Sequence, residues 1–187
     1  AASITHEWQV VDDIRQHMLY FLENHDEQRI ASDFFCGSAM KAIPAAAMSL
    51  FFQKNPFMLY CGQEFGEKGM DKEGFSGRDG RTTIFDYWSP STLAHAYQDS
   101  ADETLTAEQK YLAATYRQLL RLANEEKALR EGDTFDLMYV NPGSEFFDPR
   151  TNFAFLRKKD DEVMLIVLNF AQEARQLQVC IPGHAFD

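Results

Sequence analysis

The stretch that most constrains the fold is Met18–Asp26, with the sequence MLYFLENHD. Its unbroken apolar run, residues 18–22, predicts a short strand that is buried on both faces. The polar residues that follow this run at once are Glu23, Asn24, His25 and Asp26. They place two carboxylates, an amide and an imidazole at the carboxyl end of the strand. In parallel α/β proteins the functional groups gather at that end of the strands.

A second short apolar run, Phe57–Cys61, predicts another buried strand that ends in polar residues, among them Glu64. Residues 31–53 lie between the two strands and favour a helix, in which Pro44 either introduces a kink or marks the first turn of a shorter helix. Residues 18–61 therefore predict a β-α-β unit with parallel, neighbouring strands about 4.8 Å apart. Asp26 and Glu64 could then face the same cleft.

Residues 62–105 form a long stretch rich in glycine and aromatic residues. A loop of this length within a compact domain is usually functional or disordered, and its aromatic content argues against disorder. Because it follows the carboxyl end of a strand, we expect it to form a wall of a binding cleft. Tyr87 and Trp88 are candidates to offer flat aromatic contact surfaces to a ligand, and Arg81 is a candidate supporting charge.

Two helices and a set of strands complete the prediction. Residues 3–16 and 107–130 have apolar residues at helical spacing, and Thr106 with Gln109 predicts a capping box before the second helix. Strand-like runs separated by polar turns follow Gly132, namely 135–140, 153–157, 163–170 and 176–181. This spacing is typical of an antiparallel β-sandwich, of which only the first strands fit before the end of the sequence.

The net charge of −11 argues against nucleic-acid and anionic-membrane partners, because both require a basic face. The three cysteines are far apart and form no CxxC pair, so a thiolate metal site is not expected. We expect no cofactor and find no histidine spacing typical of a metal site. The sequence leaves the cellular compartment open.

Two segments carry a resemblance to a known family. FLENHD (21–26) resembles the motif at the end of barrel strand seven in the α-amylase family, glycoside hydrolase family 13. LYCGQEFG (59–66) resembles the strand-eight segment of that family, and FAFLR and VMLIVLNF resemble strands of its C-terminal β-sandwich. The resemblance implies an α/β fold made of the last two β/α units of a (β/α)₈ TIM barrel, over residues 1–132. A partial antiparallel β-sandwich would follow over residues 133–187.

The resemblance also implies roles for matching residues. Asp26 would bind the sugar hydroxyls and stabilise the oxocarbenium-like transition state, while His25 and Asn24 would contact the same sugar. Glu23, Arg29 and Glu64 would be supporting residues. The retaining mechanism needs a nucleophile and a general acid about 5–5.5 Å apart. In this family they come from strands four and five, and the chain is expected to begin just before strand seven. We therefore expect the chain alone to be inactive.

Three interpretations remain open at this point. The first is a C-terminal fragment of an α-glucan-active hydrolase, which would meet α-glucan or maltooligosaccharide and could self-associate through its exposed barrel strands. The second is a non-catalytic glucan-binding or interaction module descended from an amylase. The third is an unrelated α/β protein in which Asn-His-Asp occurs by chance.

Overall fold

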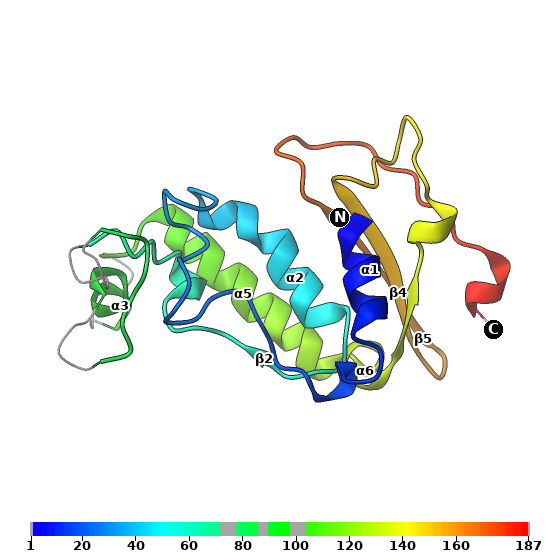
Figure 1. The fold of residues 1–187 in the computed structure, drawn as a ribbon, viewed down its shortest axis with the longest axis horizontal. Coiled ribbons are helices and arrows are strands. Elements are labelled where there is room, and N and C mark those ends of the chain that lie inside the picture. The colour runs from blue at the N-terminus through cyan, green and yellow to red at the C-terminus, as the bar shows by residue number, and fades with distance from the viewer. Residues whose placement is uncertain (1, 72–77, 86–89, 98–103, 187) are drawn as a thin grey trace. The chain divides into compact units, whose positions relative to one another are not determined.

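The computed structural model describes residues 2–71, 78–85, 90–97 and 104–186. The described part mixes helices and strands (Figure 1). Its α-helices are α1 (Ala2–Val10), α2 (Ile43–Phe51), α3 (Ser91–Ala96), α5 (Ala107–Glu125) and α6 (Lys127–Glu131). Its strands are β1 (Tyr20–Phe21), β2 (Phe57–Met58), β3 (Asp133–Asp136), β4 (Asn152–Lys159) and β5 (Glu162–Asn169). None of the described helices has the length and apolar character needed to cross a membrane.

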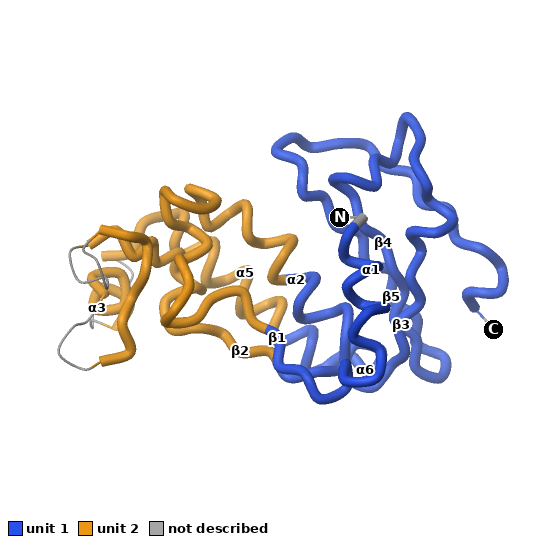
Figure 2. The backbone as a smooth tube through the Cα atoms, in the orientation of Figure 1, with its two compact units in different colours: residues 1–20, 47–56, 121–187 blue, residues 21–46, 57–120 orange. Residues whose placement is uncertain are grey.

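The chain forms two compact units, and each is built from separate stretches of sequence (Figure 2). Unit 1 contains residues 1–20, 47–56 and 121–187. Unit 2 contains residues 21–46 and 57–120. The predicted division of the chain at residue 132 stays a prediction, because it refers to a larger barrel and sandwich.

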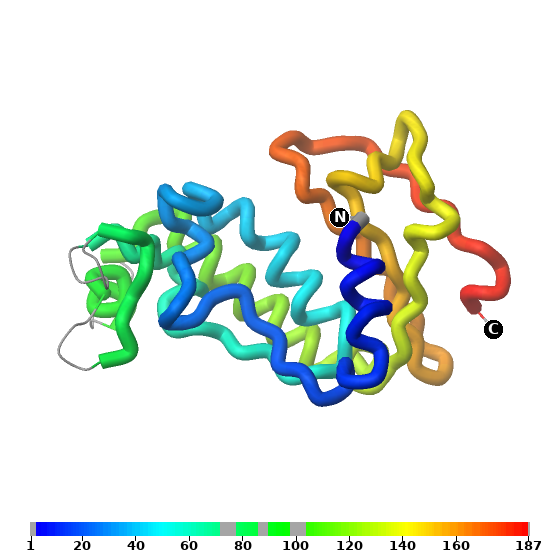
Figure 3. The backbone as a smooth tube through the Cα atoms, viewed as in Figure 1, coloured from blue at the N-terminus to red at the C-terminus, as the bar shows by residue number. Residues whose placement is uncertain are grey.

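The predicted order of strand, helix and strand is present as β1, α2 and β2, and the two strands pair in one small sheet. Figure 3 shows the two segments running side by side in the same direction. Both strands are shorter than predicted. Burial on both faces is wrong for β1, because Leu19 and Phe21 are 48% and 44% exposed. Leu22, on the other face, packs against the buried core of unit 2.

Local sequence explains where the helices begin and end. Pro44 is the second residue of α2, so of the two alternatives left open by the sequence the structure has the shorter helix with proline in its first turn. Before α5, the Thr106 N–H donates to Gln109 Oε1 at 2.9 Å and the Gln109 N–H donates to Thr106 Oγ1 at 3.2 Å, which confirms the capping box. The predicted helix 107–130 is present but is interrupted, because Glu126 has an extended backbone that separates α5 from α6.

Unit 2 has a core in which small and large side chains interlock. Its fully buried members are Ala31, Ala39, Ala46, Leu112 and Tyr116. The Tyr116 hydroxyl accepts a hydrogen bond from Gln63 Nε2 at 2.9 Å, so this polar group is satisfied inside the core. Burial raises the pKa of Tyr116 to about 12. The hydroxyl is therefore protonated at neutral pH.

Unit 1 is organised around an antiparallel sheet of order β3-β4-β5. The predicted strands 153–157 and 163–170 correspond to β4 and β5. The run 135–140 is a strand only to Asp136 and then turns into a 3-10 helix, Met138–Val140. The fourth predicted strand, 176–181, is wrong. The Asn141 side chain bonds the Cys180 carbonyl and N–H at 3.0 and 2.9 Å, so a side chain satisfies this backbone where a strand ladder was expected.

Aromatic side chains from separate segments of unit 1 pack on one face of this sheet. The Phe52 ring packs edge-on against Phe153 and Phe155 of β4, with centroids 5.3 and 4.9 Å away. The Trp8 ring of α1 packs against Phe52 at 5.3 Å. The three phenylalanines are 2% exposed or less. Phe52 thus provides an apolar connection between α1 and β4.

Arg157 of β4 is a fully buried cation bonded to backbone carbonyl groups of unit 1. Its side chain donates to Phe51 O at 2.5 Å, Leu129 O at 3.0 Å and Gly132 O at 2.6 Å. Phe51 ends α2, and Leu129 lies in the last turn of α6. Helix C-termini carry partial negative charge and unpaired carbonyls, which suit a guanidinium. Burial lowers the pKa of Arg157 to about 10, so it stays charged at neutral pH.

The tight turn between β4 and β5 gives a first testable prediction. Lys159 pairs with Glu162, and Asp160 has a φ of +53°, in the left-handed region. We expect Asp160→Val to cost about 1–2 kcal/mol of unfolding free energy, because a β-branched residue is strained there. Asp160→Asn removes the same exposed Lys127 ion pair but tolerates this backbone, so it should cost under about 0.5 kcal/mol. Urea unfolding measures both, and equal costs would contradict the turn argument.

Candidate functional site

The Asn24–Glu27 segment forms a compact turn just after β1. Its backbone is held by the Asn24 side chain, whose Oδ1 accepts from the N–H groups of Asp26 at 2.8 Å and Glu27 at 2.9 Å. This is the bonding by which asparagine favours turns. His25 Nε2 lies 3.5 Å from Asp26 Oδ1, and the side chains of His25 and Asp26 are 44% and 71% exposed. The turn therefore presents an imidazole and a carboxylate to solvent.

A buried ion pair closes the base of this turn. Arg29 Nη1 donates to Glu23 Oε2 at 2.7 Å, and both side chains are 1% exposed. The second carboxylate oxygen of Glu23 accepts the Ile30 N–H at 2.8 Å. Burial raises the pKa of Glu23, whereas the Arg29 guanidinium and the bond from Ile30 act in the opposite direction. The pair joins the two ends of the segment that carries Asp26.

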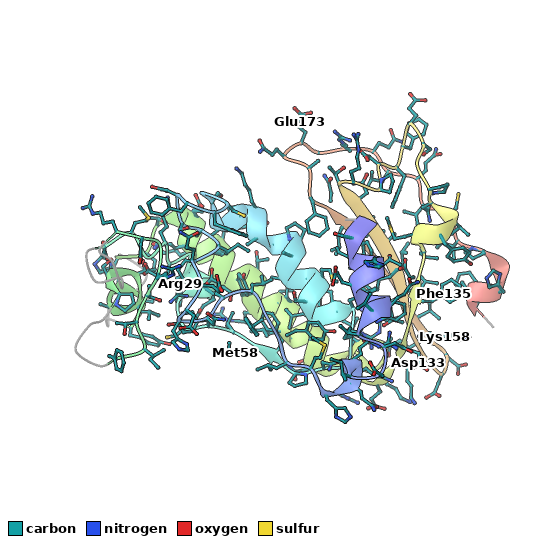
Figure 4. All side chains as sticks on the ribbon, viewed as in Figure 1. Arg29, Met58, Asp133, Phe135, Lys158 and Glu173 are labelled. Carbon is teal, nitrogen blue, oxygen red and sulfur yellow. The ribbon has the colours of Figure 1, made fainter. Side chains whose placement is uncertain are left out.

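Arg29, labelled in Figure 4, is also fixed by groups from other segments of unit 2. Its Nε donates to Thr82 Oγ1 at 2.9 Å, and its Nη2 donates to Cys61 O at 2.7 Å. Its guanidinium carbon lies 4.1 Å from the centre of the Tyr60 ring, a cation–π contact. The residue thus connects the turn after β1, the segment after β2 and the loop around residue 82.

The structure places the other predicted residues as follows. Glu64 accepts the Gly62 N–H at 3.1 Å and is half-buried, whereas Arg81 forms a 3.4 Å ion pair with Asp79 on its own loop. Tyr87 and Trp88 lie outside the described residues. Of the predicted supporting residues that the structure describes, Glu23 and Arg29 are in direct contact with each other. His25 and Asp26 lie next to each other in the turn. The catalytic and binding roles of all these residues stay predictions.

A cavity of about 600 Å³ lies in unit 2 beside Arg29 and Tyr60. The remaining lining residues are mostly apolar or aromatic, namely Cys61, Thr83, Ile84, Phe85, Pro90, Leu93, Ala94 and Tyr97. Asp26 and His25 are not among the residues that line it. Burial raises the pKa of the Cys61 thiol, and the Glu64 carboxylate raises it further, so the thiol is protonated at neutral pH.

Sequence reasoning missed the part that Tyr60 and Thr82 play in holding Arg29. Thr82 is 1% exposed, and it lies 53 positions from Arg29 in a loop without hydrophobic periodicity. A lone threonine in such a loop carries no signal of its partner. Tyr60 was predicted only as part of a strand, and a cation–π contact has no sequence spacing that could reveal it.

Comparison with solved structures finds proteins of similar fold. A cyclomaltodextrinase matches with a TM-score of 0.52 and 22% identity, over 81% of this chain and 21% of that chain. A mutant of isomaltulose synthase from Erwinia rhapontici NX5, solved in complex with D-glucose, matches with a TM-score of 0.51 and 19% identity. That match covers 88% of this chain and 37% of that chain. At these identities the similarity concerns the fold, and the chain folds like a part of each enzyme.

Sequence comparison adds no relative to these structures. No protein-family model matches the sequence, and no curated protein matches it.

Proposed function

We propose that this chain is part of an α-glucan-active glycoside hydrolase of the α-amylase type, and that the Asn24–Glu27 turn contacts the sugar. The observation that carries the proposal is the exposed Asp26 and His25 on a turn whose base is closed by the buried Glu23–Arg29 pair. The similarity of the fold to part of a cyclomaltodextrinase supports it. So does the motif resemblance of residues 21–26 and 59–66.

The proposal assigns chemistry to the exposed groups of the turn. An ionised Asp26 can accept hydrogen bonds from two sugar hydroxyls and can stabilise positive charge that develops on the ring. His25 can donate or accept a bond to the same sugar. A retaining mechanism also needs a nucleophile and a general acid about 5–5.5 Å apart. We propose that other parts of the hydrolase supply this pair, so the chain alone releases no reducing ends from starch.

A glucan-binding module is the second candidate function. The cavity beside Arg29 favours it, because aromatic side chains such as Phe85 and Tyr97 line a space large enough for a small ligand. Association through β1, whose Phe21 is exposed beside the exposed Leu19, stays a prediction in either case.

The test is binding of maltoheptaose by the 187-residue chain, measured by calorimetry, together with reducing-end release from soluble starch. We expect no release of reducing ends. Where the chain binds the oligosaccharide, Asp26→Asn should weaken binding about 10- to 100-fold, the loss expected for a hydrogen bond to a charged group.

Asp33→Asn is the matched control, because Asp33 is an exposed carboxylate of the same unit paired only loosely with Lys68 at 3.5 Å. It should leave the affinity unchanged. Equal affinity of wild type and Asp26→Asn would reject the role of the turn. Starch hydrolysis by the folded chain would show that it contains its own catalytic carboxylates, and Asp26 with Glu64 would be the first pair to test. Urea unfolding followed by tryptophan fluorescence confirms that each variant is folded.

A further inference from the structure

The Thr82 hydroxyl is buried at the point where three segments of unit 2 meet. It accepts the Arg29 Nε–H at 2.9 Å and lies 3.4 Å from the Tyr60 hydroxyl. The Tyr60 hydroxyl in turn donates to the Thr82 carbonyl at 3.2 Å. Thr82 is 1% exposed, so no solvent can replace these bonds without a change of structure. The hydroxyl therefore satisfies a buried donor of Arg29.

The bond at Nε determines where the rest of the guanidinium points. A guanidinium is planar, and its N–H groups form a rigid fork. With Nε held by Thr82, the Nη1 group is aimed at Glu23 and the Nη2 group at the Cys61 carbonyl, both at 2.7 Å. Without the bond at Nε, the orientation of the guanidinium plane depends on these two bonds and on the contact with the Tyr60 ring.

We propose that Thr82 is a positioning residue for the turn that presents His25 and Asp26, and that it acts through Arg29 and Glu23. The Arg29 backbone strengthens the connection, because its N–H donates to Gly80 O at 2.6 Å. The loop 80–82 thus holds Arg29 by its main chain and its side chain. The functional consequence rests on the proposed function of the turn, whereas the geometric consequence can be measured without any sugar.

The test compares Thr82→Val with Thr82→Ser by NMR of the whole chain. Valine keeps the shape of threonine but cannot accept from Arg29 Nε, and serine restores the hydroxyl. The Ile30 amide is the reporter of Glu23, because its N–H donates to Glu23 Oε1 at 2.8 Å. We expect Thr82→Val to speed hydrogen exchange at Ile30 by roughly tenfold and to shift the His25 ring signals. Thr82→Ser should return both toward wild type.

Two controls separate positioning from a general loss of stability. Thr83→Val alters the neighbouring threonine, whose hydroxyl accepts the Phe85 N–H at 3.2 Å, and should leave Ile30 and His25 unchanged. The Tyr116 amide, in the core of the same unit, should exchange in Thr82→Val no more than about twofold faster than in wild type. Thr82→Ala also lacks the hydroxyl and serves in place of Thr82→Val where that variant does not fold.

Unchanged Ile30 exchange and His25 signals in Thr82→Val would overturn the proposal. Equal acceleration at Ile30 and Tyr116 would also overturn it, because Thr82 would then stabilise the unit as a whole. Maltoheptaose binding provides the functional readout, with the affinity of Thr82→Val about tenfold weaker and that of Thr82→Ser restored. Where the wild type does not bind maltoheptaose, the glucan-binding module is rejected, and the NMR comparison still decides the role of Thr82.

Discussion

Replacement of Arg29 by methionine is expected to destabilise the protein by about 3–5 kcal/mol, the loss typical of breaking a buried ion pair on one side. The Glu23 carboxylate, 1% exposed, would be left in the interior without its counter-charge. Thr82 Oγ1 and the Cys61 carbonyl would lose their donor as well. The free energy of unfolding of a single domain is about 5–15 kcal/mol, so this substitution removes a large part of it.

Urea unfolding, with hydrogen exchange of residues 21–46 as the readout for unit 2, measures this effect. Arg117→Met makes the same chemical change at an exposed position of α5 and should cost under about 0.5 kcal/mol. The double variant Glu23→Gln/Arg29→Met should be more stable than Arg29→Met alone, because it no longer buries an unpaired charge. A double variant less stable than Arg29→Met would contradict this account.

Arg157→Met is expected to lower the free energy of unfolding of unit 1 by a similar amount, about 3–5 kcal/mol, for a different physical reason. Within the part of the chain that the structure describes, the Arg157 guanidinium donates to three backbone carbonyls rather than to a carboxylate, those of Phe51, Leu129 and Gly132. Methionine fills part of the volume but donates to none of them. Two helix ends would then have buried acceptors that neither water nor protein satisfies.

Tryptophan fluorescence during urea unfolding is measured in a Trp88→Phe background, which leaves Trp8 as the remaining tryptophan of the two in the sequence. The signal then follows unit 1, because Trp8 packs in its aromatic core. Arg150→Met is the matched control, because Arg150 is 85% exposed and pairs with Asp148 at 2.9 Å on the surface. The control should cost under about 1 kcal/mol, as exposed pairs do. Equal losses in the two variants would show that the carbonyl contacts of Arg157 contribute little.

The sequence predicted those features that depend on local pattern. The run Val163–Phe170 predicted β5, and Thr106 with Gln109 predicted the start of α5, because strand periodicity and capping act within a few residues. Glu23 and Arg29 were predicted as supporting residues with the help of the family resemblance, not from local pattern alone. Their catalytic context was available only through the family resemblance.

The features that were wrong or missed depend on contacts between distant residues. Residues 176–181 have the composition of a strand, yet the Asn141 side chain, 39 positions before Cys180, bonds the Cys180 backbone. Gly132 does not have a left-handed backbone. A glycine is required there because a Cβ would lie 2.2 Å from Ala128 O and 2.6 Å from Lys158 O. Neither contact leaves a mark in the neighbouring sequence.

The interleaving of the two units affects the order in which the chain can fold during synthesis. Trp8 packs against Phe52, and Phe52 packs against Phe155, which follows Trp8 by 147 positions. Synthesis adds about 5–20 residues per second, so roughly 7–30 s pass between the synthesis of Trp8 and that of Phe155. All residues of unit 2 are present once Leu120 has been synthesised. At that point the β4 residues that complete the aromatic cluster around Trp8 and Phe52 have not yet been made. Unit 1, which contains α1, is therefore completed after unit 2.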